Sequence, residues 1–253
     1  MWAVAAGVAI GVGAWHAHRV GDFPPGCSAV AIALLAVSIL VGSKLLYLAE
    51  ARFYSYDDYV PLIARGLLHG FRIPGGILLL AAAMPLVGGM LRLPWLQFGD
   101  AVIPMAALAL VFIRLGCFLN GCCFGKVSSL PWAISFPRGS WVFWYHKTHG
   151  WVPLGAQHSL PVHPLQLYFV LAALLTAGIL FWQQRRVVWP GRLQLLFYAL
   201  FFGSTAALEP LRENYLTLNH WLAPFAAVLA TGALVGPMWG RRKLRVQGSA
   251  SPL

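Results

Sequence analysis

The sequence predicts an all-α integral membrane protein with about seven transmembrane helices and a polar loop and arm region outside the membrane. Of its 253 residues, 59% are hydrophobic and only 10% are charged, whereas a soluble domain carries about 25% charged residues. Several apolar runs approach the roughly 20 residues that cross a bilayer as a helix. The Lys and Arg residues lie at the edges of these runs. Together these observations exclude a soluble protein.

Seven apolar runs, taken in chain order, are the expected spans of a single transmembrane domain over residues 1–253. The first run is short, and it lacks the basic region and cleavage site of a signal peptide, so we expect a retained helix. The two longest connections carry most of the polar and aromatic residues, and the first of them is expected to lie at the headgroup level as an interfacial helix or short arms. The spans lie near residues 1–15, 26–48, 74–91, 101–118, 165–182, 193–209 and 219–239, and the two connections are residues 49–73 and 119–164.

The basic residues indicate the orientation. The formal net charge is +11, with 18 Lys and Arg against 7 Asp and Glu. Short cytoplasmic loops are enriched in Lys and Arg, so we expect a multi-pass protein of the bacterial inner (plasma) membrane with its N-terminus and both long connections outside and its C-terminus in the cytoplasm. Basic residues at the ends of spans contact anionic lipid headgroups, and no nucleic-acid partner is expected. The residues that seven alternating spans place on the cytoplasmic side are Arg19, Arg92, Arg185, Arg186, Arg192 and the basic tail at 241–245.

The stretch that begins with Arg114 contains the strongest candidate for chemistry. An arginine at a helix centre costs about 2.5–3.5 kcal/mol on insertion scales, so it is usually paired or faces a polar cavity. Its guanidinium is a fork of donors suited to a phosphate. Gly116, Gly121 and Gly125 allow close approach of the backbone to a ligand, and Asn120 can both donate and accept. The alternative is an arginine that snorkels to the interface beside glycines that pack helices.

A second candidate group lies at the start of the fifth predicted span. His163 precedes a proline that suits the first turn of a helix, and Gln166 and Tyr168 follow it. Polar side chains at the mouth of a span can bind a headgroup or can simply cap the helix. The spacing alone leaves both roles open.

A third candidate group closes the sixth predicted span. Glu209 and Arg212 are three residues apart, so their side chains can pair across one helical turn or bracket a ligand. The pattern slightly favours a structural ion pair.

Cysteines form the last group. Four residues, Cys27, Cys117, Cys122 and Cys123, are too few for a disulfide scaffold. The last three fall within seven residues, where they could be small packing residues, a disulfide in an oxidising compartment, a catalytic thiol or metal ligands. A vicinal pair without a nearby Cys-x-x-Cys is not a typical zinc pattern, and the sequence favours packing.

Three ordered patterns resemble the prolipoprotein diacylglyceryl transferase family. The first is R-L-G-x-F-x-N-G-x-x-x-G-[RK], which starts at Arg114. The second is H-P-x-Q-L-Y, which starts at His163, and the third is an acidic residue followed three positions later by Arg, at Glu209. The resemblance covers residues 40–215 and includes the layout of the spans.

The resemblance implies a transferase that moves a diacylglyceryl group from phosphatidylglycerol to the lipobox cysteine thiol of a preprolipoprotein, with glycerol phosphate leaving. The partners are then the phospholipid, the lipobox preprolipoprotein and the membrane, and neither a cofactor nor a metal is expected. Arg114 would hold the phosphate with help from Asn120, and His163 would orient the headgroup or act as base. Glu209 and Arg212 would shape the outer gate of the lipid cavity. The residues expected to bind substrate are Gly75, Gly76, Gly116, Gly121, Gly125, Gln166, Tyr168, Glu209, Arg212 and Arg72.

Four positions depart from the family pattern. Pro74 stands where a histidine is usual, Cys122 replaces an acidic residue, Phe169 replaces a carboxylate, and Thr205 replaces a second arginine. Arg72, two residues from the vacated histidine position, could supply the missing positive charge.

These departures keep a second function open, a catalytically altered or inactive lipid-binding relative that acts as a membrane scaffold. A small transporter is a third hypothesis. The two polar connections outside the membrane and the scarcity of charges at mid-span argue against it.

Overall fold

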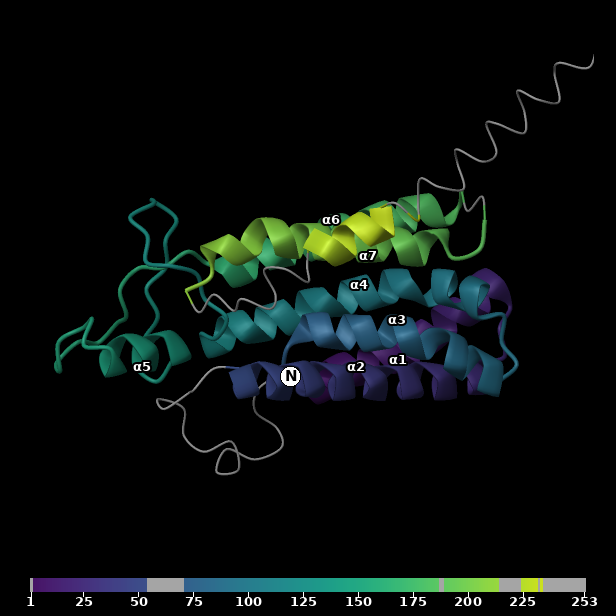
Figure 1. Ribbon diagram of the computed structural model, residues 1–253, viewed down its shortest axis with the longest axis horizontal. Coiled ribbons are helices and arrows are strands. Elements are labelled where there is room, and N and C mark those ends of the chain that lie inside the picture. The colour runs from purple at the N-terminus through teal and green to yellow at the C-terminus, as the bar shows by residue number, and fades with distance from the viewer. Residues whose placement is uncertain (1, 54–70, 187–188, 214–223, 232, 234–253) are drawn as a thin grey trace, which may run out of the picture.

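The computed structural model describes most of the chain, and its regular structure is helical (Figure 1). The described residues are 2–53, 71–186, 189–213, 224–231 and 233. Within these ranges there is no named strand, and β-type pairing is limited to isolated bridges. The elements are α1 (Trp2–Gly21), α2 (Pro25–Phe53), α3 (Ile73–Met90), α4 (Trp95–Asn120), α5 (Trp141–Thr148), α6 (Leu165–Gln184), α7 (Arg192–Leu208) and the 3-10 helix η1 (Glu209–Leu211).

The long helices lie side by side and alternate in direction, so the bundle has two ends (Figure 1). Helix α2 packs along α3, helix α4 packs along α1 and α6, and α7 contacts α6 and α4. Helix α5 and the loops around it lie beyond one end of the bundle (Figure 1). We call residues 121–164 the cap segment and this end the cap end. The α1–α2 and α3–α4 connections lie at the opposite end, which we call the turn end.

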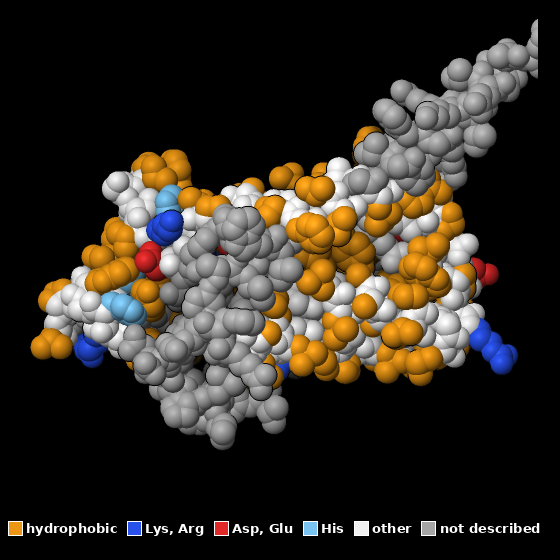
Figure 2. Space-filling model, in the orientation of Figure 1, with side chains coloured by type: hydrophobic (Ala, Val, Ile, Leu, Met, Phe, Trp, Pro, Cys, Tyr) orange, Lys and Arg blue, Asp and Glu red, His pale blue; other side chains and the backbone are white. Residues whose placement is uncertain are grey.

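The outer surface of the bundle is apolar. Four described helices, namely α2 over Pro25–Ala49, α3, α4 and α6, are long and apolar enough to cross a membrane. Large apolar side chains on them are exposed, among them Val37, Leu171 and Leu175. Figure 2 shows hydrophobic side chains along the helical part of the visible face. Such a surface is unfavourable in water and fits the hydrocarbon of a bilayer, and the prediction of a helical membrane protein is confirmed at this level.

The expected boundaries of the spans need three adjustments. Helix α1 continues to Gly21, well beyond the expected end at residue 15. Helix α2 continues to Phe53, so the connection expected from residue 49 begins later. Helix α4 begins at Trp95, well before the start expected near residue 101, whereas α7, with 17 residues, corresponds to the span expected at 193–209. Of the span expected at 219–239, only residues 224–231 and 233 are described, and they are helical. Residues 54–70 of the first long connection lie outside the described residues.

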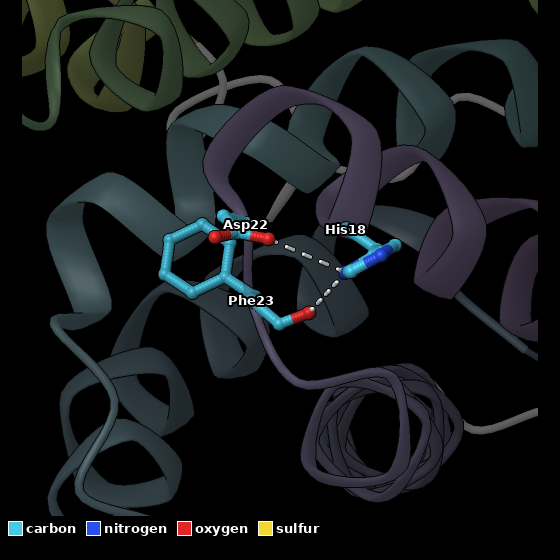
Figure 3. A network of polar contacts seen from close by, with 3 residues as sticks. All are labelled: His18, Asp22 and Phe23. Carbon is cyan, nitrogen blue, oxygen red and sulfur yellow. Dashed lines mark hydrogen bonds and ion pairs between the residues drawn. The ribbon is translucent and has the colours of Figure 1, made fainter.

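Helix α1 ends at the turn end in a compact turn (Figure 3). The Nδ1 atom of His18 lies 3.2 Å from the carbonyl oxygen of Phe23 and 3.8 Å from a carboxylate oxygen of Asp22. Asp22 has a φ of 53° and its N–H donates to the His18 carbonyl, which closes the last helical turn. The Phe23 ring meets Phe98 edge-on near the start of α4. The turn therefore anchors α1 and α2 to α4.

A buried carboxylate joins two helices at the same end. Asp100 of α4 is 5% exposed, and it accepts hydrogen bonds from the N–H groups of Gly191 (2.7 Å), Leu193 (3.0 Å) and Gln194 (3.1 Å). These N–H groups are the unpaired donors at the start of α7, where a negative charge is favourable. A pocket of about 470 Å³ opens beside this carboxylate. The carboxylate itself already has its hydrogen-bond partners, so it caps α7.

The cap segment has its own small core, which the sequence did not predict. Phe124, Phe136, Val142 and Val162 are buried together, and single bridges connect residues 127 and 134 to 162. Ser140 is the N-cap of helix α5, because its hydroxyl oxygen accepts from the N–H of the third residue beyond it. The connection expected at 119–164 is therefore a folded unit that covers the cap end.

Candidate active site

Helix α4 ends at the cap end in a motif that folds the chain back on the last helical turn. The Gly121 N–H donates to Phe118 O (3.0 Å) and the Cys122 N–H donates to Cys117 O (3.1 Å), which are the two bonds of a Schellman motif. Gly121 has a φ of 67°, and an added Cβ would meet the Ser140 Cβ at 2.8 Å. The motif therefore requires glycine here and places Cys122 beside Cys117.

The backbone at Gly125 joins the three sequence patterns. Its N–H donates to His163 O (3.1 Å), while the Lys126 N–H donates to Leu211 O (2.8 Å). The chain at 124–126 thus lies between the start of α6 and the end of α7. An added Cβ at Gly125 would meet the His163 Cβ at 2.7 Å and the Leu211 carbonyl oxygen at 2.9 Å, so only glycine fits. This close contact explains why patterns far apart in the sequence form one site.

Arg114, nearly two turns before the end of α4, is buried at 6% exposure. Its guanidinium carbon lies 4.1 Å from the centre of the Phe169 ring on α6. Among the described residues no carboxylate forms an ion pair with it. A cation over an aromatic face is favourable, with a value of about 2 kcal/mol when desolvated. The ring therefore supports the guanidinium from one side without neutralising its charge.

Arg212 and Glu209 form the ion pair that their spacing predicts. The Arg212 Nε atom lies 2.7 Å from a carboxylate oxygen of Glu209, and both side chains are buried. The Arg212 guanidinium carbon also lies 5.9 Å from the centre of the Phe169 ring. Although burial opposes the charged form, the Glu209 carboxylate raises the pKa of Arg212 above its ordinary value. Two guanidinium groups therefore share one ring, with one paired carboxylate beside them.

Three cysteine side chains converge next to these arginines. The Sγ atoms of Cys117, Cys122 and Cys123 all lie within 4.8 Å of one another, and all three are free thiols. Cys123 has a φ of 58°, so the backbone turns a second time directly after the Schellman motif. The neighbouring Cys117 and Cys122 thiols, together with the charges of Arg212 and Arg114, lower the pKa of Cys123 well below its ordinary value.

His163 belongs to a chain of hydrogen-bonding side chains at the start of α6. The Trp132 Nε1–H of the cap segment donates to the Tyr168 hydroxyl oxygen (2.8 Å), and that hydroxyl lies 3.3 Å from His163 Nδ1. Because the Tyr168 oxygen accepts from Trp132, its own proton is available to Nδ1. This assignment of the proton leaves the other ring nitrogen of His163, Nε2, as a donor.

Gln166, in the first turn of α6, is fully buried. Its amide nitrogen donates to the Cys122 carbonyl oxygen at 2.6 Å, while its amide oxygen has no hydrogen-bond partner within the described chain. A buried acceptor without a partner is unfavourable unless a ligand supplies a donor. Gln166 is therefore a candidate contact for a hydroxyl group.

Two expected substrate-binding glycines lie elsewhere. Gly75 and Gly76 are buried in the contact between α2 and α3, where an added Cβ would meet the carbonyl oxygens of Gly42 (2.5 Å) and Ile39 (2.6 Å). Close helix contacts in membranes use small residues in this way. The structure thus gives both glycines a packing function.

The other expected residues lie around the cluster. Asn120 is exposed at the end of α4, and Gly116 is half-buried within that helix. Arg72 precedes α3, its N–H donates to Ser43 O (2.9 Å), and its guanidinium lies 6.0 Å from the Tyr47 ring centre. Asn120 can still reach a ligand from the cap end, whereas these two contacts place Arg72 beside Ser43 and Tyr47 at the α2–α3 contact.

The departures from the family pattern have local structural explanations. Pro74 is buried in the first turn of α3, where a missing N–H costs nothing. The Thr205 hydroxyl donates to the carbonyl oxygen of Phe201 (2.8 Å) within α7. Phe169 stands at the centre of the cluster, under both guanidinium groups. Sequence reasoning counted Phe169 only as a lost carboxylate and missed its contact with the arginines, because a ring face carries no formal charge in a pattern.

The fold and the cluster define a helical membrane protein that keeps a buried, positively charged site under a folded cap. The chain belongs to the prolipoprotein diacylglyceryl transferase family, whose model matches residues 1–236.

Individual relatives agree with this assignment. A phosphatidylglycerol–prolipoprotein diacylglyceryl transferase of Ralstonia pickettii is 32% identical over 233 residues, which cover 82% of this chain and 75% of the relative. The Cupriavidus necator protein of the same name is 28% identical over 232 residues, covering 86% and 76%. The Clostridium tetani protein is 31% identical over 175 residues, covering 69% and 64%, and the match to the Idiomarina loihiensis protein covers 60% of that relative. The last two matches thus span less than two thirds of the relatives' length.

Proposed function

We propose that this protein transfers a diacylglyceryl group from phosphatidylglycerol to the lipobox cysteine thiol of a preprolipoprotein. The observation that carries the proposal is the buried cluster in which Arg114 and Arg212 share the Phe169 ring, while Glu209 is the one carboxylate of the described chain that pairs with them. The cluster keeps a net positive charge away from water, where an anion is bound most strongly. The phosphate of an anionic lipid fits this requirement, and the name of the family supplies the reaction.

The chemistry is substitution at a glyceryl carbon. The thiol loses its proton, its sulfur bonds to the carbon that carries the phosphate ester, and the carbon–oxygen bond breaks with its electron pair on oxygen. Glycerol phosphate leaves, and the departing phosphate can carry the released proton. Arg114 and Arg212 stabilise the charge that develops on the phosphate, which is the main electrostatic contribution of the site. Because Arg114 has no carboxylate partner among the described residues, its donors are available for this purpose.

The remaining polar groups orient the lipid headgroup. With the Tyr168 proton assigned to His163 Nδ1, the Nε2 atom is a donor, and this assignment favours orientation of an oxygen over removal of a proton. The free amide oxygen of Gln166 accepts from a glycerol hydroxyl. Asn120 and the backbone around Gly121 assist from the end of α4.

The topology belongs to the same proposal. We place a single domain over residues 1–253 in the bacterial inner membrane, with seven spans, the N-terminus outside and the C-terminus in the cytoplasm. The support is that Arg19, Arg92, Arg185 and Arg192 lie at the turn end, opposite the cap segment (Figure 1). The cap segment and the arginine cluster then face the side where a secreted preprolipoprotein arrives.

A direct assay tests the function. Purified protein in vesicles that contain phosphatidylglycerol should add one diacylglyceryl group to a labelled lipobox peptide, as a gain in mass. Vesicles of phosphatidylcholine alone and a peptide with serine in place of the lipobox cysteine are the controls. Binding of phosphatidylglycerol without any gain in peptide mass would reject transfer and support the lipid-binding scaffold.

A further inference from the structure

The three thiols at the cap end have no part in the transfer chemistry proposed above. The Schellman motif places Cys122 against Cys117. Cys123 follows with a left-handed backbone, and its Sγ atom lies beside those of the other two cysteines. The result is three Sγ atoms within 4.8 Å of one another, close to the buried guanidinium groups. A cysteine in left-handed backbone is uncommon and unfavourable, and a requirement for the Cys123 thiol in this cluster would explain it.

The geometry fits one metal ion. A zinc–sulfur bond is about 2.3 Å long and the site is tetrahedral, which separates two bound sulfurs by about 3.8 Å. Each pair of thiols therefore needs to close by about 1 Å at most. Thiolates select soft ions such as Zn²⁺, Cd²⁺ and Cu⁺ over the oxygen-seeking Mg²⁺ and Ca²⁺. The spacing of the three cysteines in the sequence is not typical of zinc sites. The folded backbone nevertheless brings their thiols together.

The charges around the thiols favour a divalent ion. Three thiolates and one divalent ion carry a net charge of −1. Arg114 and Arg212 contribute +2 and Glu209 contributes −1, so the loaded cluster is neutral. With three neutral thiols and no ion, the same cluster carries +1. Since a buried net charge is unfavourable, the ion completes the charge balance of the site.

We propose that Cys117, Cys122 and Cys123 form a three-thiolate site for a soft divalent metal ion, and that the bound ion competes with the anion held by Arg114 and Arg212. The competition follows from charge, because the loaded cluster no longer attracts a phosphate. This second part rests on the function proposed above, whereas binding of the ion does not. The site departs from the sequence expectation that the protein has no metal.

Cadmium is the probe for binding. The full chain in phosphatidylcholine vesicles is reduced, freed of reductant and titrated with Cd²⁺ while the thiolate-to-metal charge-transfer absorption is recorded. We expect a band that saturates at one ion per chain. Cys122→Ser and Cys123→Ser should each weaken binding at least about a hundredfold, since loss of a mere outer-shell partner already costs 10–100-fold. Cys27→Ser is the matched control, because Cys27 is exposed at the turn end, and it should leave the titration unchanged.

Three outcomes would overturn the metal site. They are the absence of a charge-transfer band, a band that survives alkylation of the thiols, and a band that Cys27→Ser removes. Alkylation of the folded wild-type protein also keeps the test valid if a serine variant fails to insert.

The competition has a separate test with glycerol phosphate as the anion. Binding of glycerol phosphate to the metal-free protein should weaken at least about tenfold once Cd²⁺ is bound, as a net charge is lost in a low-dielectric site. In the Cys122→Ser, Cys123→Ser double variant, Cd²⁺ should have no effect. Equal affinity with and without the ion in the wild-type protein would overturn the competition. Failure of the metal-free protein to modify a lipobox peptide would instead reject the transferase proposal and leave the charge-transfer result standing.

Discussion

The two ends of α4 bury opposite charges in different ways. At the turn end, Asp100 accepts three backbone hydrogen bonds from the start of α7, so groups within the protein satisfy its carboxylate. At the cap end, Arg114 lies over the Phe169 ring, and no carboxylate of the described chain pairs with it. Fourteen residues of helix, about 21 Å, separate the two groups.

The comparison separates a structural charge from a functional one. Burial of a charge is costly, and partners that are fixed by the fold remove that cost. Asp100 has such partners and holds two helices together. Arg114 has a partner that supports its charge but does not cancel it, which leaves its donors for a ligand. A buried charge with an incomplete set of partners is thus a stronger indicator of function than burial alone.

The largest expected effect is on Arg114. Arg114→Ala should lower transfer to a lipobox peptide at least about a hundredfold, the order of effect of losing one donor to a developing oxyanion. Arg114→Lys should lose most activity as well, because an ammonium group cannot reproduce the planar fork of donors. Gain in peptide mass measures activity, and size-exclusion chromatography checks the fold. An Ala variant near the wild-type rate would contradict the role, and equal loss of expression in both variants would indicate a structural arginine.

Asp100 should show the opposite pattern. Asp100→Ala leaves three helix N–H groups without an acceptor, and each such buried group costs about 1–3 kcal/mol. We expect a clear drop in thermal stability in detergent, with the activity of the remaining folded protein close to wild type. Asp100→Asn keeps one acceptor and should lose less stability. A large fall in the rate per folded molecule would show that the turn end contributes to chemistry.

Phe169 should have a moderate effect. Phe169→Leu keeps an apolar side chain and removes the ring face under both guanidinium groups. A cation–π contact contributes about 0.5–2 kcal/mol, so transfer should fall by roughly 2- to 30-fold while stability changes little. The rate is compared at saturating and at limiting phosphatidylglycerol. An unchanged rate at both would show that the ring does not position Arg114.

The smallest effect on catalysis should come from Gly75. The α2–α3 contact leaves no room for a Cβ, so Gly75→Ala should lower thermal stability with little change in the rate per folded molecule. Gly125→Ala is the paired comparison, because Gly125 joins the segments that carry the site, and this variant should lose activity. A selective loss of activity in Gly75→Ala would restore the substrate-binding role expected from the sequence.

Much of the fold was predictable because apolar runs of helix length have few alternatives in a membrane. The runs locate the helices, and the larger differences lie at their ends: α1 and α2 continue to Gly21 and Phe53, and α4 begins at Trp95. The cap segment was not predictable in detail. Its core consists of a few aromatic and branched residues, such as Phe136 and Val162, that are scattered without a helical or strand period.

The parts of the candidate site that could be predicted from the sequence are the charged residues. Arg114 and the Glu209–Arg212 pair could be chosen because charge in or beside a span needs a reason. The convergence of Cys117, Cys122 and Cys123 could not be predicted from the sequence. It depends on a helix that ends at Gly121 and on a residue with left-handed backbone shortly after it. The packing of Gly75 against α2 could not be foreseen either, because a glycine that contacts a ligand and a glycine that contacts another helix have the same sequence signal.

The contact at Gly125 also determines when the protein can first become active. A membrane protein is synthesised from its N-terminus, and the spans emerge one after another. The backbone of Lys126 finds its partner only when Leu211 has been made, after α6 and α7. Arg114 therefore enters the membrane long before Arg212 can join it around Phe169. A chain still on the ribosome would hold an unfinished site, and the junction at Gly125 would delay the reaction until nearly all spans are in place.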